Sequence, residues 1–279
     1  MDIEKKNEIH KKMADKLKIY IDAIIEMYGS YIPNNRLNYL KNIDNYESLI
    51  KIHDYESING YASDDGINLP LCADRVFKKI NKIPGYGINK NHQSYNENTL
   101  IINNNTFVDY IIHVFISGTD TTKYFEDLLL HETMHFCGSG GASALKEGIN
   151  ELLTRKIALE KKLKTNGCGY PKEVKIAYEL QNLFGEDIIN QVAFINSPHE
   201  IYMFLEKELG PDAALLFFNV SDAMEKEFYL KYYKDIYSYN GISGILKKTI
   251  NYKKIDYSNV YKLINDYKNK EMNTKRINK

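Results

Sequence analysis

The sequence predicts an α+β protein that is mostly helical, with a small sheet in its N-terminal part and a helical C-terminal lobe. Three observations support this. Apolar residues recur at helical spacing over 3–28, β-branched residues are concentrated in 109–117, and helical patterns with capping signals follow from residue 119 onward. With 279 residues, 43% of them hydrophobic, the chain can bury one large core or two lobes.

The first region, residues 1–95, is expected to be helical and rich in loops. The stretch 3–28 is predicted as one long helix, because apolar residues return every three or four positions before a glycine stop. Residues 37–53 are predicted as helix in two pieces. Glycine-containing turn signals dominate 57–98, with a short helix expected near 74–80.

The second region, residues 96–279, is expected to be the catalytic region. Whether the two regions form separate lobes or one compact unit stays open. Strands are predicted at 99–102 and 109–117, where β-branched and aromatic residues gather. A helix is expected over 119–138, between threonine N-cap residues and a terminal glycine. A further helix is expected over 143–163.

The C-terminal half contains two more helix starts. Pro171 opens a helix that Gly185 closes, since proline is favoured in the first turn and glycine just past the end. Ser197-Pro198-His199-Glu200 has the form of a capping box with proline at the first helical position. These signals predict a nearly continuous series of helices.

Charge and cysteine content exclude several classes of protein. Lysine plus arginine equal aspartate plus glutamate at 37 each, so nothing favours nucleic acid or an anionic membrane as partner. Three cysteines do not form a disulfide framework. The sequence shows no signal peptide and no apolar run of the roughly 18 residues that span a bilayer. We therefore expect a soluble, cytoplasmic protein; its oligomeric state is left open.

The segment His131-Glu132-Thr133-Met134-His135 is the strongest functional motif. In a helix, His131 and His135 lie one turn apart on the same face, so both imidazoles can bind one tetrahedral zinc ion. Glu132 can then reach a water molecule and take its proton. The motif predicts a zinc site with Glu132 as the catalytic base.

The next predicted helix offers the third ligand that a catalytic zinc needs. Glu147 and Glu151 are four positions apart, hence on one helix face, and the glycine-containing linker 139–142 allows that helix to fold back. Either glutamate could be the ligand. A metzincin-type third ligand would fall on Gly141, which has no side chain to coordinate a metal.

With these motifs the chain resembles the gluzincin group of zincin peptidases, in which HExxH is completed by a glutamate on the following helix. Lys146-Glu147-Gly148 is similar to the motif of the aminopeptidase branch, and Glu147 with Glu151 is similar to the thermolysin pattern. The gap after His135 is shorter than in either branch, and Glu151 stands where the thermolysin pattern has aspartate.

The resemblance implies a zincin-like fold and assigns roles to these residues. His131, His135 and Glu147 would bind a single zinc ion per chain, and Glu151 would hydrogen-bond to His131 and orient it. The implied activity is hydrolysis of peptide bonds in a peptide or protein substrate.

Two further features complete the predicted site. A tyrosine or histidine is expected to stabilise the oxyanion; Tyr170, Tyr178 and His199 are candidates, and Tyr178 is favoured. The strand 110–116 is either a core strand or an edge along which an extended peptide could pair. Two other functions stay open: an intracellular regulatory protease with one protein target, and a metal-binding pseudoenzyme that acts as a binding module.

Overall fold

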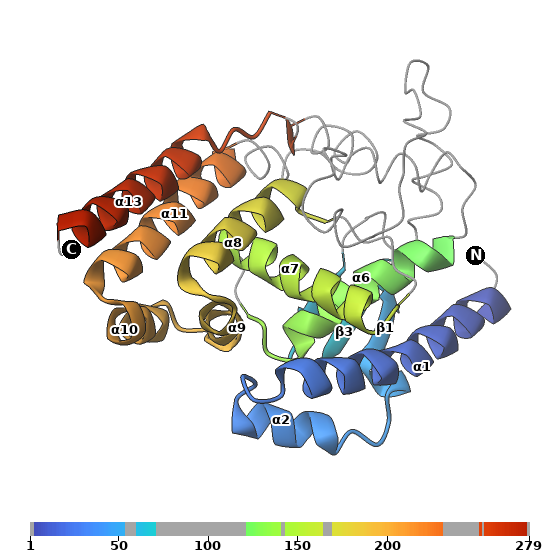
Figure 1. Ribbon diagram of the computed structural model, residues 1–279. Helices are drawn as coiled ribbons and strands as arrows, with labels where there is room; N and C mark the ends of the chain where they lie inside the picture. The colour runs from blue at the N-terminus through green and yellow to red at the C-terminus, as the bar shows by residue number, and fades with distance from the viewer. Residues whose placement is uncertain are drawn as a thin grey trace, which may run out of the picture.

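The computed structural model describes residues 3–53, 60–70, 121–140, 143–163, 169–230, 251–252 and 254–277. This part of the chain is mostly helical and contains one small sheet, which confirms the predicted α+β class (Figure 1). The strands predicted at 99–102 and 109–117 and the helix near 74–80 lie outside the described residues. Of the described helices, none combines the length and apolar character needed to cross a membrane.

The helices account for most of the described chain. They are α1 (Ile3–Tyr28), α2 (Asn34–Lys41), α6 (Thr121–Phe136), α7 (Ala144–Glu160), α8 (Pro171–Phe184), α9 (Glu186–Phe194), α10 (Pro198–Leu209), α11 (Pro211–Phe228) and α13 (Ser258–Ile277), with a short 3-10 helix, η1 (Glu47–Leu49). The strands are β1 (Ile50–His53), β2 (Tyr61–Ser63) and β3 (Gly66–Pro70).

Serine hydroxyls cap two of the expected helices, and of these two caps only Ser197 was predicted. The hydroxyl of Ser143 accepts a hydrogen bond from the backbone N–H of Lys146 at 3.3 Å, which caps α7. Ser197 accepts from the N–H of Glu200 at 3.3 Å in the same way and caps α10. Because each bond satisfies an N–H group that has no partner within its helix, these local signals define the helix starts.

The prediction of helix in two pieces over 37–53 is wrong in its second piece. After α2 and the single turn η1, the chain forms β1, which pairs in parallel with β3 so that Ile50 lies opposite Ile67. Ile50 and Ile67 are both buried. The pairing partner lies 17 positions away in the sequence, so spacing within 37–53 could not reveal it.

The sheet has the strand order β1-β3-β2, with β2 antiparallel to β3. A tight turn at Asp64 and Asp65 joins β2 to β3, as the turn signal predicted. Gly66 follows this turn with φ at +145°, and a Cβ there would lie 2.4 Å from the carbonyl oxygen of Leu49. Only glycine lets the hairpin approach the end of η1 this closely.

Helix α7 lies at the centre of the molecule, among α6, α8, α9 and α11 (Figure 1). A Cβ added to Gly148 would lie 2.6 Å from the carbonyl carbon and oxygen of Glu173, so glycine permits close contact between α7 and α8. One cluster of buried side chains extends from Met13 in α1 to Ile264 in α13. The helix that carries Glu147 therefore belongs to the common core.

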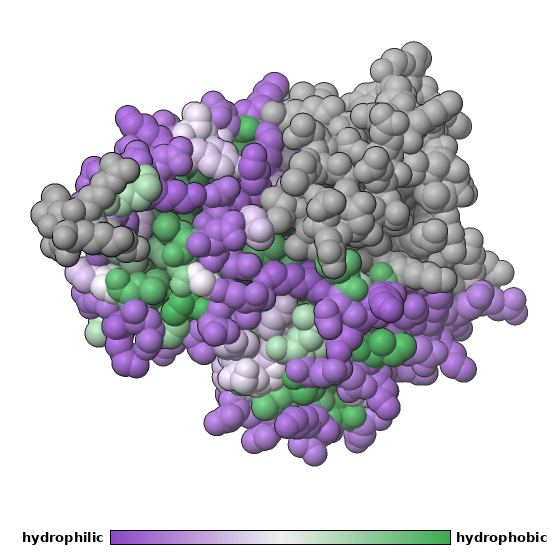
Figure 2. Space-filling model, viewed as in Figure 1, coloured by the Kyte–Doolittle hydropathy of each residue, from purple (hydrophilic) through white to green (hydrophobic). Residues whose placement is uncertain are grey.

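Hydrophilic residues cover most of the visible surface outside the undescribed segments, and apolar residues gather over α10 and α11 (Figure 2). Met203 in α10 and Leu215 in α11 are among the half-exposed apolar side chains. The surface over α1 is largely polar in the same view, as expected for an amphipathic helix with one face in the core.

Candidate metal centre

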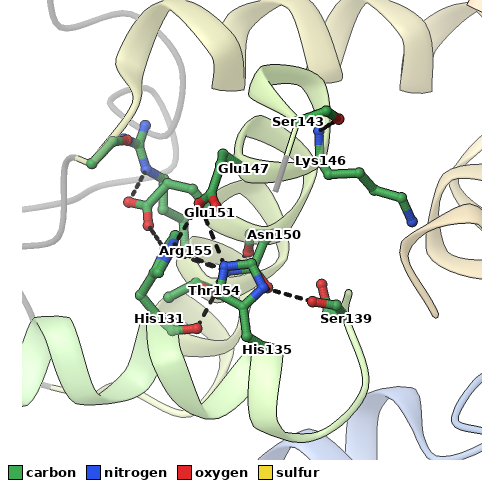
Figure 3. A network of polar contacts seen from close by, with 11 residues as sticks. His131, His135, Ser139, Ser143, Lys146, Glu147, Asn150, Glu151, Thr154 and Arg155 are labelled. Atoms are coloured by element: carbon green, nitrogen blue, oxygen red, sulfur yellow. Dashed lines mark hydrogen bonds and ion pairs between the residues drawn. The ribbon is translucent and has the colours of Figure 1, made fainter. Parts of the chain in front are cut away.

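Helices α6 and α7 bring His131, His135 and Glu147 together. Each residue offers one ligand atom, and these atoms lie within 4.8 Å of one another. The Oε2 atom of Glu147 lies 3.2 Å from Nε2 of His131 and 3.4 Å from Nε2 of His135 (Figure 3). Two imidazole nitrogens and a carboxylate oxygen therefore point toward one place between the helices.

The other nitrogen of each imidazole is engaged by a hydrogen-bond acceptor. Nδ1 of His131 lies 2.8 Å from Oε2 of Glu151, and Nδ1 of His135 lies 2.6 Å from the carbonyl oxygen of Ser139. If each Nδ1–H donates to its acceptor, each Nε2 carries a lone pair in the neutral imidazole. Histidines that bind a metal through one ring nitrogen typically donate a hydrogen bond from the other one to a carboxylate or a carbonyl group.

The turn after α6 explains why the Ser139 carbonyl faces His135. Gly138 has φ at +111°, and the N–H of Ser139 donates to the carbonyl of Met134 at 3.1 Å. This is the hydrogen-bond pattern of a helix C-terminus closed by a left-handed glycine. Arg36 donates from Nε to the carbonyl of Phe136 at 2.7 Å and so satisfies the last turn of α6.

Two caps and a buried lysine define where α7 begins. Besides Ser143, the carboxylate of Glu225 in α11 accepts from the N–H of Ala144 at 2.9 Å. Lys146 extends away from the cluster, and its ammonium donates to the carbonyls of Ala193 at 3.1 Å and Ile195 at 2.8 Å (Figure 3). The ammonium group of Lys146 thus contacts the C-terminus of α9, while its neighbour Glu147 faces the histidines.

Glu132 is buried beside the cluster, with 6% of its surface exposed. Burial raises the pKa of its carboxyl group, although nearby His131 and His135 act to lower it. The backbone N–H of Ala62 in β2 also donates to this carboxylate. Glu132 therefore lies between the histidines and an outer strand of the described sheet, and a raised pKa suits a group that must accept a proton and return it.

The neighbouring imidazole and carboxyl groups strongly perturb one another's pKa values. Burial acts to raise the pKa of Glu147, but hydrogen bonds from His131 and His135 outweigh it and bring the pKa to about 2. Burial acts to lower the pKa of His131, and its bonds to Glu147 and Glu151 raise it well above the usual value instead. A metal cation bound between the imidazoles and Glu147 would take the place of the imidazole protons that Glu147 now contacts.

Arg155 and Asn150 are site residues that the sequence analysis missed. Arg155 donates from Nε to Oε1 of Glu151 at 3.0 Å, and the Asn150 amide donates to the carbonyl of His131 at 3.2 Å. The spacing of Glu151 and Arg155, four positions apart on one helix, was a signal for the first of these contacts. No local pattern marks Asn150.

The three oxyanion candidates occupy different places. The ring of Tyr170 stacks on His131, with centroids 5.7 Å apart and planes inclined by 29°. Tyr178 is half-buried two turns further along α8, and His199 is exposed in the first turn of α10. Among the described residues, no hydrogen bond or ring contact joins either of them to the cluster. The predicted strand 110–116 lies outside the described segments.

Comparison of the chain with protein-family models, with curated proteins and with solved structures finds no match. The chemistry of the cluster is therefore the basis for assigning a function. Two imidazoles and one carboxylate form a ligand set that catalytic zinc sites use, and a buried carboxyl group, Glu132, lies beside it.

Proposed function

We propose that this chain is a zinc-dependent peptidase of the gluzincin type, with a zincin-like catalytic region, that hydrolyses peptide bonds in peptide or protein substrates. One observation carries the proposal: both Nε2 atoms and Oε2 of Glu147 converge, while both Nδ1 atoms are engaged by acceptors. Three protein ligands would leave one coordination position of a zinc ion open, as catalysis requires.

The residues fit a zinc ion by type, number and orientation. His131, His135 and Glu147 would hold the metal, and Glu151 would orient His131 through its hydrogen bond of 2.8 Å. When bound, a zinc ion supplies Lewis acidity, which polarises a carbonyl group and lowers the pKa of water to about 7. The buried acceptors behind the imidazoles keep both rings in the orientation that ligation needs.

Glu132 is the group proposed to move the proton. Its carboxylate takes a proton from the attacking water and then gives it to the nitrogen of the peptide bond that breaks. Burial among His131, His135 and β2 supports this role, because it raises the pKa of the carboxyl group. An iron ion can use a similar ligand set for oxidative chemistry, but we propose hydrolysis because a buried acid–base group, Glu132, lies beside the cluster.

Tyr170 is the residue we propose for stabilising the oxyanion, in place of the favoured Tyr178. Its ring lies against His131. Its backbone has φ at 51° and ψ at 45°, a conformation that costs a non-glycine residue about 1 kcal/mol or more and that is concentrated at functional sites. A phenol hydroxyl is a suitable hydrogen-bond donor to a developing negative charge.

The first experiment is elemental analysis of the purified protein for zinc, iron and manganese. We expect about one zinc per chain in the wild type and a steep loss in Glu147→Ala. Glu160→Ala is the matched control, because Glu160 is exposed on the same helix. Iron in place of zinc would count against a peptidase, and unchanged zinc in Glu147→Ala would transfer the ligand role to Glu151 or another residue.

The second experiment separates an enzyme from a metal-binding pseudoenzyme. Glu132→Gln should keep its zinc and lose hydrolysis by about 10²- to 10⁴-fold, since the proton acceptor is removed and the ligands remain. Full biological activity in this variant would favour the binding module. A proteome-wide cleavage profile then distinguishes a broad peptidase from a regulatory protease with one target.

A further inference from the structure

Arg155 is a buried cation next to the proposed ligands but outside the ligand set. It lies on α7, one turn after Glu151, and only 6% of its surface is exposed. A guanidinium group without partners costs several kcal/mol to bury, so its contacts determine whether it is tolerated. Its Nε donates to Oε1 of Glu151 at 3.0 Å, and its Nη2 donates to the carbonyl of Gly169 at 2.6 Å.

The first contact holds the carboxylate that orients His131. Oε1 of Glu151 accepts from Arg155, and Oε2 lies 2.8 Å from Nδ1 of His131 (Figure 3). Because the two oxygens of one planar carboxylate are engaged by different partners, rotation of the group would break at least one charge-assisted bond. The guanidinium therefore restricts the plane in which Glu151 meets the imidazole.

The second contact holds the residue before Tyr170. A Cβ added to Gly169 would lie 3.4 Å from the carboxylate of Glu151, so the backbone at 169 packs directly on the same group. Tyr170 then takes its left-handed backbone conformation and stacks on His131. Its ring also contacts Phe228 of α11, with centroids 6.2 Å apart.

We propose that Arg155 is a positioning residue that holds Glu151 and the Gly169–Tyr170 segment together, so that both meet the same imidazole, that of His131. This rests on the proposed metal site, and it adds a residue that contacts neither metal nor substrate. The planar guanidinium suits this role because it presents donors to two acceptors in fixed directions, which a lysine ammonium does not. Arg155 thereby couples the metal affinity of the site to the position of Tyr170.

Zinc affinity, measured by competition with a chromophoric chelator, tests the first half of the inference. Arg155→Gln should bind zinc about 10- to 100-fold more weakly, because an ordering contact behind a ligand is lost. Arg155→Lys should fall between it and the wild type. Lys156→Gln is the control: Lys156 is adjacent on α7, and its contacts are Gln181 and Glu186. Circular dichroism confirms that each variant is folded.

A double-mutant cycle separates positioning from a general loss of structure. If Arg155 acts through Glu151, the variant carrying both Glu151→Gln and Arg155→Gln should bind zinc about as weakly as Glu151→Gln alone. Effects that multiply, or wild-type affinity in Arg155→Gln, would overturn the inference. Should Arg155→Gln fail to fold, Arg155→Lys decides: affinity equal to that of the wild type refutes the positioning role.

Hydrolysis at saturating zinc tests the second half. Arg155→Gln and Tyr170→Phe should each lower kcat, and the double variant should be no slower than the slower single one. Independent effects would remove Tyr170 from the coupling. A wild type that binds zinc but hydrolyses nothing would refute the proposed peptidase activity, while the affinity cycle would still decide the role of Arg155.

Discussion

Gly148 provides a sharp test of how the site is positioned. It follows Glu147 in α7, at the point where this helix contacts α8. In an exposed helix, replacing glycine by alanine stabilises a protein by about 1 kcal/mol. Here the new Cβ would lie 2.6 Å from the carbonyl carbon and oxygen of Glu173 and 2.8 Å from its Cβ. The atoms in the way belong to the backbone, or lie next to it, so α7 and α8 must separate.

The packing term should exceed the helix-propensity term. Overpacking a core costs about 1–3 kcal/mol, and obstruction by backbone favours the upper end, about 3 kcal/mol. Subtracting the gain of about 1 kcal/mol from helix propensity leaves a net loss of about 2 kcal/mol. For a chain of this size, that corresponds to a fall in Tm of about 4–8 °C. A shift of α7 also moves Glu147, so zinc affinity should fall as well.

Thermal unfolding followed by circular dichroism measures the first effect, and chelator competition measures the second. Asn182→Ala is the control, because Asn182 is exposed in α8 and reports helix propensity alone. We expect this control to gain a few tenths of a kcal/mol, up to about 0.5. If Gly148→Ala unfolds at or above the wild-type temperature, the result contradicts close contact between α7 and the backbone of Glu173.

Three further predictions concern stability. Although burial acts to raise it, hydrogen bonds from the two histidines hold the pKa of Glu147 at about 2, below the usual 4.5. The ionised carboxylate therefore contributes its full stabilisation of the metal-free protein above pH 4.5, and this stabilisation is lost as the pH falls toward 2. In urea unfolding at pH 2–6, the free energy of unfolding should fall less steeply toward acid in Glu147→Gln than in the wild type. Equal slopes would contradict this prediction. Tyr257 is one of two tyrosines whose hydroxyls donate to buried Glu173, in its case at 2.5 Å. Tyr257→Phe should therefore lower the free energy of unfolding by about 1–3 kcal/mol, measured by thermal unfolding. Tyr229→Phe, at an exposed position, should leave it unchanged. Arg36→Met removes the donor to the last carbonyl of α6 and should lower stability by about 1–2 kcal/mol in the same assay; an unchanged Tm would show that water replaces it.

Much of the fold follows from local patterns in the sequence. The spacing of apolar residues predicts α1, and Pro171 and the capping signal at Ser197 predict where α8 and α10 begin. These patterns are reliable because each depends on contacts within one helical turn. The strand β1 was assigned to helix, because a four-residue stretch acquires its structure by pairing with β3 further along the chain.

The sequence also determines which residues can form the site. His131 with His135, and Glu147 with Glu151, share helix faces because they are four positions apart, whatever the helices pack against. Only the tertiary structure decides how the two faces meet: that Ser139 lies behind His135, that Arg155 joins Glu151 to Gly169, and that Tyr170 reaches His131. With 23 tyrosines in the chain, spacing could not select Tyr170. Helical periodicity places side chains within one element, whereas distances between elements depend on packing.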